Sequence, residues 1–165
     1  MTSTTTTATT VHVNRVYIKA TAQAVWDAIT DPAWNERYGY GSPGEYDLRP
    51  GGAYRGVATK EMIDLGSPEV IIEGEVLESD PPRRLVQTWR ALFYPEIAAE
   101  GFTRLTWELT ETQPGITVLT VTHDLTDAPL SAALVTGEVV EAGGGWSFIL
   151  SDLKTLLETG TTLAG

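Results

Sequence analysis

The sequence predicts an α+β fold, in which a curved antiparallel sheet of six to seven strands wraps around a long C-terminal helix. Between residues 45 and 124, short apolar segments alternate with polar residues and are separated by turns rich in glycine and proline. This pattern is typical of antiparallel strands joined by tight turns. After Pro129, apolar residues recur every three or four positions, which indicates an amphipathic helix that can cover one face of the sheet.

The N-terminal part predicts one strand followed by two short helices. Val11 to Ile18 alternates and is rich in β-branched residues, as expected of a strand. Residues 21–29 form a predicted helix that Thr21 can cap at its beginning. Asp31-Pro32 then ends this helix and starts the second one, because proline fits best in a first helical turn.

Six further strands are expected before the long helix. They cover residues 45–48, 53–62, 69–79, 85–92, 102–112 and 116–124. The long helix is predicted over about 138–159, with a flexible beginning at Gly143-Gly144-Gly145 and an end at Gly160. Its apolar face carries Val139, Ala142, Trp146, Ile149, Leu150, Leu153, Leu156 and Leu157.

The chain is expected to form a single domain over residues 11–160. Residues 1–10 are almost all threonine and are predicted to be a disordered tail, and residues 161–165 a short second tail. The threonine-rich segment has neither the basic cluster nor the apolar core of a secretory signal. No apolar run approaches the roughly 20 residues that a membrane helix needs.

The composition excludes several classes of function. The chain has no cysteine and two histidines, His12 and His123, which excludes thiolate catalysis and metal sites built from several cysteines or histidines. We therefore expect no metal and no cofactor, and the lack of cysteine suits a cytoplasmic protein. A net charge of −11 argues against nucleic acid and anionic membrane as partners. A small molecule remains the expected partner, and a homodimer is compatible with the sequence.

A strongly curved sheet around a single helix leaves room for a ligand between the two. Strand alternation assigns one face of each strand to this space and places Ile71, Glu73 and Glu75 on the outer face. The resulting wall is largely aliphatic and aromatic, as in many ligand pockets. The predicted ligand-binding residues are Val70, Ile72, Val76, Gln87, Trp89, Leu105, Trp107, Leu119, Val121, His123, Trp146 and Leu150.

His123 is the single weak candidate for a catalytic residue. Its ordinary pKa lies near neutrality, which suits a general base, but a histidine near a strand end can equally be a structural hydrogen-bonding group. Trp89 and Trp107 carry indole N–H groups that need partners when buried, which favours a ligand with one or two acceptor oxygens. Aromatic residues of the long loop region before residue 45, which are Trp34, Tyr38 and Tyr40, can form either a lid over the cavity or part of the core.

Several short signatures occur in one fixed order along the chain. They are Trp26 with Asp31-Pro32, Arg49-Pro50-Gly51-Gly52, Gly74 with Asp80-Pro81-Pro82 and Leu85, Thr88-Trp89, and Gly145-Trp146. In these features, over roughly residues 11–159, the chain resembles the activator-of-heat-shock-protein-ATPase-like branch of the START/SRPBCC superfamily. The resemblance implies the helix-grip fold that also occurs in birch-pollen allergen. It also implies that the shared positions are structural and that none of them is catalytic.

The resemblance implies a range of functions rather than one. The superfamily includes proteins for lipid and hormone binding, polyketide cyclisation and dehydration, antibiotic sequestration and chaperone co-activation. We favour a protein that binds or sequesters a small apolar or aromatic molecule. The alternatives are a cofactor-independent enzyme of the polyketide cyclase/dehydratase or hydrolase type, and a co-chaperone-like protein-interaction module. The sequence leaves open whether the protein is an enzyme.

Overall fold

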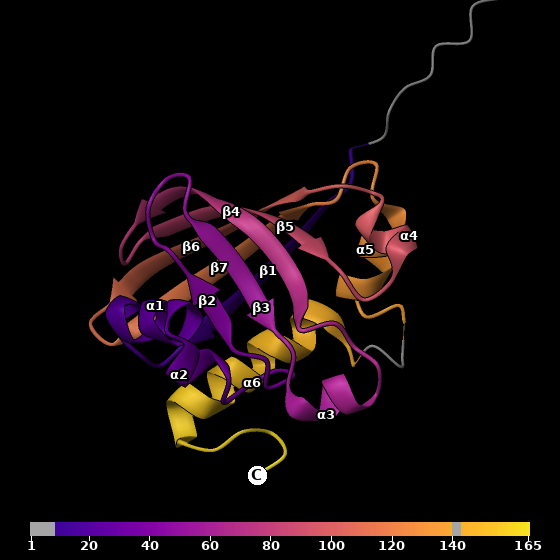
Figure 1. Cartoon of the computed structure of the whole chain (residues 1–165). Coiled ribbons are helices and arrows are strands. Elements are labelled where there is room, and N and C mark those ends of the chain that lie inside the picture. Colours follow the sequence, from indigo (N-terminus) through magenta and orange to yellow (C-terminus); the bar gives the residue numbers. More distant parts are fainter. Residues whose placement is uncertain (1–8, 140–142) are drawn as a thin grey trace, which may run out of the picture.

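A computed structural model describes residues 9–139 and 143–165, and within them seven strands form one antiparallel sheet (Figure 1). The strand order is β1-β7-β6-β5-β4-β3-β2, so each pair of neighbours except β1 and β7 is also consecutive in the chain. The strands are β1 (Val11–Ile18), β2 (Gly44–Tyr46), β3 (Ala53–Val57), β4 (Val70–Asp80), β5 (Arg84–Ala91), β6 (Thr103–Gln113) and β7 (Ile116–Asp124).

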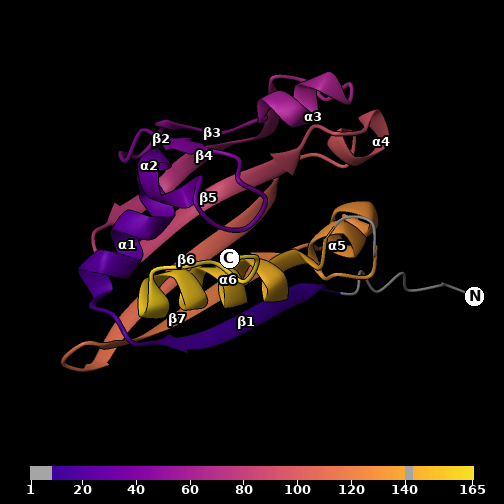
Figure 2. The same cartoon turned by 90° about the horizontal axis from the view of Figure 1, so that it is seen from below.

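The sheet curves around the C-terminal helix, as the helix-grip prediction requires. Seen from below, α6 lies between the side of the sheet that holds β1 and β7 and the side that holds β2 and β3 (Figure 2). Shorter helices fill the two ends of this arrangement, with α1 and α2 at one end and α3, α4 and α5 at the other (Figures 1 and 2). The helices are α1 (Ala22–Thr30), α2 (Pro32–Asn35), α3 (Lys60–Asp64), α4 (Pro95–Ala98), α5 (Pro129–Val135) and α6 (Gly145–Thr159).

The two short helices after β1 form as predicted. The Thr21 hydroxyl accepts a hydrogen bond from the Ala24 N–H at 3.1 Å and so caps α1. Asp31 ends α1 and caps α2, because its carboxylate accepts from the Ala33 N–H at 2.9 Å. Val25 and Trp26 point into the core, which joins this helix to the sheet.

Two predicted elements differ from the structure by more than two residues at one end. The strand expected over 53–62 ends at Val57, because the Thr59 hydroxyl accepts from the Met62 N–H and starts α3. The helix expected over 138–159 begins at Gly145, since Gly143 and Gly144 both have positive φ and leave the helical path. Ala142, assigned to the apolar face of that helix, lies outside the described residues.

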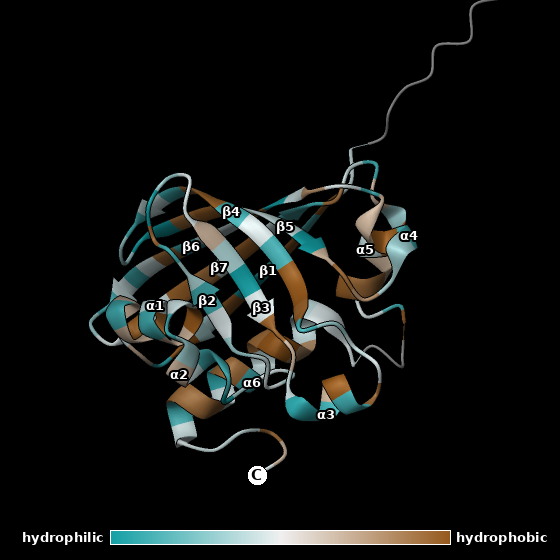
Figure 3. Cartoon of the chain, viewed as in Figure 1, coloured by the Kyte–Doolittle hydropathy of each residue, from teal (hydrophilic) through white to brown (hydrophobic). Residues whose placement is uncertain are grey.

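The alternation of strands β5, β6 and β7 was predicted correctly. Their inward sets are buried and form the core together with α6: Leu85, Gln87 and Trp89; Leu105, Trp107 and Leu109; Leu119, Val121 and His123. Figure 3 shows hydrophobic stretches on these strands and on α6. The side chains of Trp146, Leu150, Leu153 and Leu156 supply the opposing face of the helix.

The assignment of Ile71 to the outer face was wrong. Ile71 is 2% exposed and lines the cavity. Its neighbour Ile72 also lines the cavity, so two consecutive residues of β4 face the same side. The pairing of β3 with β4 shifts here, because Gly56 lies opposite Ile72 while Val57 lies opposite Val70. Ile71 is therefore the extra residue of a β-bulge, and a bulge turns a side chain away from the face that simple alternation gives it.

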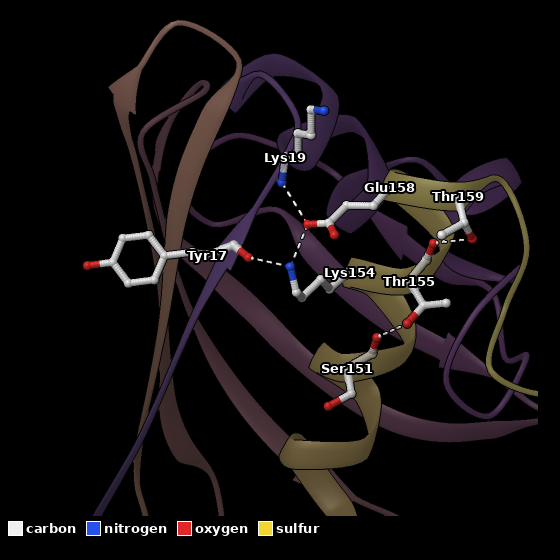
Figure 4. Close-up of polar contacts among 7 residues, drawn as sticks. All are labelled: Tyr17, Lys19, Ser151, Lys154, Thr155, Glu158 and Thr159. Carbon is white, nitrogen blue, oxygen red and sulfur yellow. Dashed lines mark hydrogen bonds and ion pairs between the residues drawn. The ribbon is translucent and has the colours of Figure 1, made fainter.

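Helix α6 is tied to the edge of the sheet by two charged side chains. Lys154 donates from Nζ to the carbonyl oxygen of Tyr17 at 2.9 Å and also pairs with Glu158 (Figure 4). Glu158 in turn accepts from the backbone N–H of Lys19 at 2.8 Å. Because β1 is an edge strand, these contacts occupy backbone groups that no neighbouring strand reaches, and they fix α6 over the β1 side.

The backbones of β4 and β5 approach each other closely at Gly74. The ladder between β4 and β5 runs through Glu73↔Arg90 and resumes at Val76↔Gln87, and between them the Glu75 N–H donates to the Thr88 side chain at 2.8 Å. A Cβ at Gly74 would stand 1.9 Å from the carbonyl oxygen of Thr88. Only glycine permits this close approach of the two backbones.

We predict that Gly74→Ala destabilises the fold by more than about 2 kcal/mol, because the added methyl group meets backbone and not a movable side chain. Urea unfolding followed by circular dichroism measures the loss. Gly115→Ala is the control: Gly115 has φ +80° but open space around a Cβ, so it reports only the conformational cost, about 1 kcal/mol. Equal losses in the two variants would contradict the close approach at Gly74.

Candidate functional site

A cavity of about 460 Å³ lies between the concave face of the sheet and α6. Its wall is built by β2 to β6, by the loop before β2, by α5 and by the first residues of α6. Nine of the described residues that line it are aromatic, and none of them is Asp, Glu, Lys, Arg or His. The cavity is therefore an uncharged, aromatic compartment.

Five of the twelve predicted ligand-binding residues line this cavity. They are Ile72, Trp89, Leu105, Trp107 and Trp146. Gln87 and His123 lie directly behind the wall, where each is hydrogen-bonded to a tryptophan that faces the cavity. Val70 is half-buried at the start of β4. The other four, Val76, Leu119, Val121 and Leu150, are buried in the solid core and do not reach the cavity.

The cavity lies to one side because α6 covers only part of the sheet. None of the described residues of β1 or β7 lines it, and three of the predicted residues that miss the wall belong to β7. Helix α6 makes its main sheet contact with the β1 side, where Lys154 and Glu158 hold it. The free volume is left under β3 to β5, on the far side of the sheet.

Sequence reasoning missed most of the tyrosines of the wall. Tyr38, Tyr40, Tyr46, Tyr54 and Tyr94 all line the cavity, and four of them lie between residues 38 and 54. The sequence shows that this segment is rich in tyrosine and glycine, but it has no periodicity that indicates which side chains face the interior. Leu134 and Val135 of α5 were also missed, because this short helix was not predicted.

Gln87 holds two rings of the wall from behind. Its Oε1 accepts from the Tyr46 hydroxyl at 2.9 Å and from the Trp107 Nε1–H at 3.1 Å. An indole N–H can only donate, so the atom that faces it must be the amide oxygen. The Gln87 Nε2 is buried and has no partner among the residues that the structure describes. Gln87 therefore fixes the orientation of Trp107 and Tyr46 at some cost in stability.

His123 fixes a third ring in the same way. The Trp146 Nε1–H donates to Nδ1 of His123 at 3.1 Å, and Nε2 of His123 lies 2.7 Å from the Thr103 hydroxyl. The Thr103 hydroxyl donates to the carbonyl oxygen of Trp89 at 2.9 Å, so the His123 Nε2–H must donate to Thr103. The donor and the acceptor are therefore assigned for each hydrogen bond that leads from Trp146 through His123 and Thr103 to Trp89. Burial lowers the pKa of His123 to about 3, which keeps the ring neutral.

The buried tyrosines stay protonated. Burial raises the pKa of Tyr54 to about 12 and holds the pKa values of Tyr38 and Tyr46 above their ordinary value as well. Tyr46 and Tyr54 stack with ring centroids 4.4 Å apart, and the Tyr38 hydroxyl donates to the carbonyl oxygen of Ala28 at 2.8 Å. These hydroxyls can take part in hydrogen bonds, but their high pKa values make them poor bases near neutral pH.

The loop before β2 is anchored to α6 beside the cavity. The Asp152 carboxylate accepts from the Gly39 N–H and from the Leu163 N–H, both at 2.8 Å. Tyr40 stacks on Phe148, and its hydroxyl accepts from the Gly145 N–H at 3.1 Å. The segment 161–165, predicted as a tail, is thus held at Leu163. Of the aromatic residues of this loop, Tyr38 is buried in the core, whereas Tyr40 is 42% exposed and lies on the cavity wall.

Across residues 9–139 and 143–165, no three histidine, aspartate or glutamate side chains lie close enough together to hold a metal ion. No helix in the same residues is long and apolar enough to cross a membrane. What the described wall offers chemically is aromatic surface, hydroxyl groups and shape.

Comparisons with known proteins agree with the fold. Among solved structures, CalU16 from Micromonospora echinospora is 24% identical, with a TM-score of 0.58 over 81% of this chain and 71% of that one. DynU16, a protein in the dynemicin biosynthetic locus, is 25% identical, with a TM-score of 0.64 over 92% of this chain and 48% of that one. An HSP90 activator from Plasmodium falciparum is 19% identical, with a TM-score of 0.62 over 90% of this chain and 96% of that one.

No curated protein sequence matches this chain. The family model described as activator of Hsp90 ATPase homolog 1-like protein matches residues 19–158, which include all but the first strand and the C-terminal residues. The match spans the residues of the cavity wall, the close approach at Gly74 and nearly all of helix α6. The chain therefore belongs to the family of activator of Hsp90 ATPase homolog 1-like proteins.

Proposed function

We propose that this protein binds or sequesters a small apolar or aromatic molecule in the cavity between the sheet and α6. The observation that carries the proposal is the cavity itself, about 460 Å³ in volume with an aromatic and uncharged wall. Cavities of this size and composition are typical of small-molecule sites. A ligand that buries about 200 Å² of apolar surface gains roughly 5 kcal/mol before the entropic costs of binding.

The setting of this binding site follows from the composition. A net charge of −11 supports a partner that is neither nucleic acid nor an anionic membrane. The lack of cysteine is consistent with the cytoplasm, where we place the protein in this proposal. Among the structural neighbours, DynU16 comes from a biosynthetic locus, which supports a role with a small molecule here too.

An enzyme of the polyketide cyclase/dehydratase or hydrolase type is the second candidate. Such a reaction needs a base or nucleophile that reaches the substrate. The described lining has no carboxylate, imidazole or amine. Burial raises the pKa values of its hydroxyl groups at Tyr38, Tyr40, Tyr46 and Tyr54. His123 lies behind the wall, and its Nδ1 lone pair already accepts from Trp146. These features favour binding over catalysis.

A co-chaperone-like interaction module is the third candidate. The HSP90 activator from Plasmodium falciparum shares the fold with this chain at 19% identity, which is support for the architecture alone. The tests below separate this candidate from a binding protein, because an interaction module has no need of an open cavity.

We predict that Nile red, a neutral apolar dye, binds the native protein in a one-to-one complex, with a rise in its emission and quenching of tryptophan fluorescence. Ile72→Trp and Ile149→Trp should each weaken this binding at least about ten-fold, because both side chains line the cavity and a larger ring occupies it. Fluorescence titration measures the affinity.

Ile63→Trp is the matched control, since Ile63 is exposed on α3 and does not line the cavity. Positions such as Val76 and Leu119 are unsuitable for this test, because a tryptophan there would disrupt the solid core. Thermal unfolding checks that each variant is folded. Undiminished dye binding in both cavity variants would refute the proposal and favour the interaction module.

We predict that the His123 ring stays neutral at pH values well below its ordinary pKa. The free energy of unfolding should therefore decrease as the pH falls. Its pKa is about 3 in the folded protein and about 6.5 in the unfolded chain, so the unfolded chain binds the extra proton first. This group therefore lowers stability as pH falls from about 6.5, by about 1.4 kcal/mol per pH unit.

Urea unfolding of the native protein and of His123→Gln between pH 4 and 6.5 isolates this contribution, because the carboxylates titrate alike in both. The expected result is a steeper loss of stability in the native protein. NMR of the His123 ring supplies the second readout. A ring that titrates near pH 6.5, or equal slopes in both proteins, would show that His123 is open to protons and revive it as a base.

A further inference from the structure

Two tyrosines that line the cavity use their hydroxyl protons in hydrogen bonds to other groups of the protein. Tyr38 donates to the carbonyl oxygen of Ala28 at 2.8 Å, and Tyr46 donates to Oε1 of Gln87 at 2.9 Å. In each case the acceptor is an oxygen that cannot donate, so the direction is certain. Each hydroxyl oxygen keeps its lone pairs.

Most side-chain nitrogen donors of the wall, with the exception of the Trp89 indole, already donate to other groups of the protein. The indole N–H groups of Trp107 and Trp146 donate to Gln87 and His123 behind the wall. The two amide protons of Asn35 go to the carbonyl oxygens of Ile29 and Gly44, at 3.1 and 2.9 Å. The sequence argument for acceptor oxygens on the ligand depended on free indole N–H groups. That argument named Trp89 and Trp107. The Trp107 N–H already has a partner in Gln87, whereas the described residues give the Trp89 N–H no hydrogen-bond partner, so the expectation still applies at Trp89.

The parts of these groups that remain free to contact a ligand are hydrogen-bond acceptors and the electron-rich faces of aromatic rings. The hydroxyl oxygens of Tyr38 and Tyr46 can accept, and the faces of aromatic rings carry the negative side of their quadrupole. No described lining residue carries a positive charge, and the whole chain has a net charge of −11. A ligand with a negative charge would lose its hydration in this cavity without gaining a counter-charge.

Two features of the cavity mouth could favour an acceptor or an anion. The N-terminus of α6 reaches the cavity, and a helix N-terminus attracts negative charge. Its Gly145 N–H, however, already donates to the Tyr40 hydroxyl at 3.1 Å. Because Tyr40 accepts in this bond, its own proton is available, but it lies at the partly exposed rim and not in the interior.

We propose that the cavity selects flat aromatic molecules that carry a hydrogen-bond donor and no negative charge. This inference rests on the proposed function and names the chemical class of the ligand. The donor meets the hydroxyl oxygens of Tyr38 and Tyr46, and the ring system stacks among the tryptophans of the wall. Carboxylates and phosphates of the same size bind more weakly, because the wall gives them no cation and the donors of Trp107 and Trp146 are already occupied by Gln87 and His123.

The test uses two probes of the same size and shape, 2-aminoanthracene and anthracene-2-carboxylate. At neutral pH the first is an uncharged donor and the second is an anion that only accepts. Fluorescence titration, checked by calorimetry, measures the affinity of the native protein for each. The expected result is that 2-aminoanthracene binds at least about ten-fold more tightly than the carboxylate.

Tyr46→Phe tests the acceptor directly, because it removes the hydroxyl oxygen and keeps the ring. Its affinity for 2-aminoanthracene should fall about three- to ten-fold, the usual value of one hydrogen bond, while the carboxylate stays weak. Tyr17→Phe is the control, since Tyr17 is exposed on β1 and does not line the cavity. Gln87→Leu is a second variant, and it acts on the other probe. It frees the Tyr46 and Trp107 donors, so the affinity for anthracene-2-carboxylate should rise and the ratio of the two affinities should fall.

The outcomes separate this inference from the proposed function. Binding of neither probe nor of Nile red would overturn both. Equal binding of the two probes, or tighter binding of the carboxylate, would overturn the selectivity while the binding function stands. A preference for 2-aminoanthracene that is unchanged in folded Tyr46→Phe and Gln87→Leu would overturn the assignment of these oxygens.

Discussion

The architecture depends on one geometric constraint: a single helix has to cover a sheet much wider than itself. A helix with its side chains is about 10 Å across, whereas seven strands at about 4.8 Å spacing span almost three times that width. Curling the sheet reduces the mismatch but does not remove it. The chain places α6 against the β1 side, where Lys154 and Glu158 satisfy the backbone of the edge strand. The other side of the sheet is left to loops, short helices and the cavity.

The close approach at Gly74 and the bulge at Ile71 are local departures of β4 from a regular strand. At Gly74 the backbones of β4 and β5 come so close that only a residue without Cβ fits. The bulge beside it turns both Ile71 and Ile72 toward the interior. The bulge thus also shapes the wall of the cavity on this side of the sheet.

The order of the strands, of the two helices after the first strand and of the long helix could be predicted from sequence, because period-two and period-3.6 patterns are local. The inward faces of β5, β6 and β7 were correct for the same reason, since Gln87, Trp107 and His123 follow simple alternation. Alternation cannot say where along a buried face the helix rests, however. For this reason Leu119 and Val121, with the right orientation, lie under α6 in the solid core. The short helices α3, α4 and α5 were not predicted. Tyr46 and Tyr54 escaped prediction because they lie on two very short strands, where too few residues alternate to assign a face.

Buried polar residues behind an aromatic wall have a cost that needs a reason. Gln87 leaves its Nε2 without a partner among the described residues, and His123 is held neutral with a pKa far below its ordinary value. Apolar residues of similar volume would avoid both penalties. Gln87 and His123 fix the orientation of two tryptophans. Each accepts a hydrogen bond from an indole that could otherwise turn its N–H into the cavity. The polar residues on the strands thus determine the chemistry of a surface that they do not themselves form.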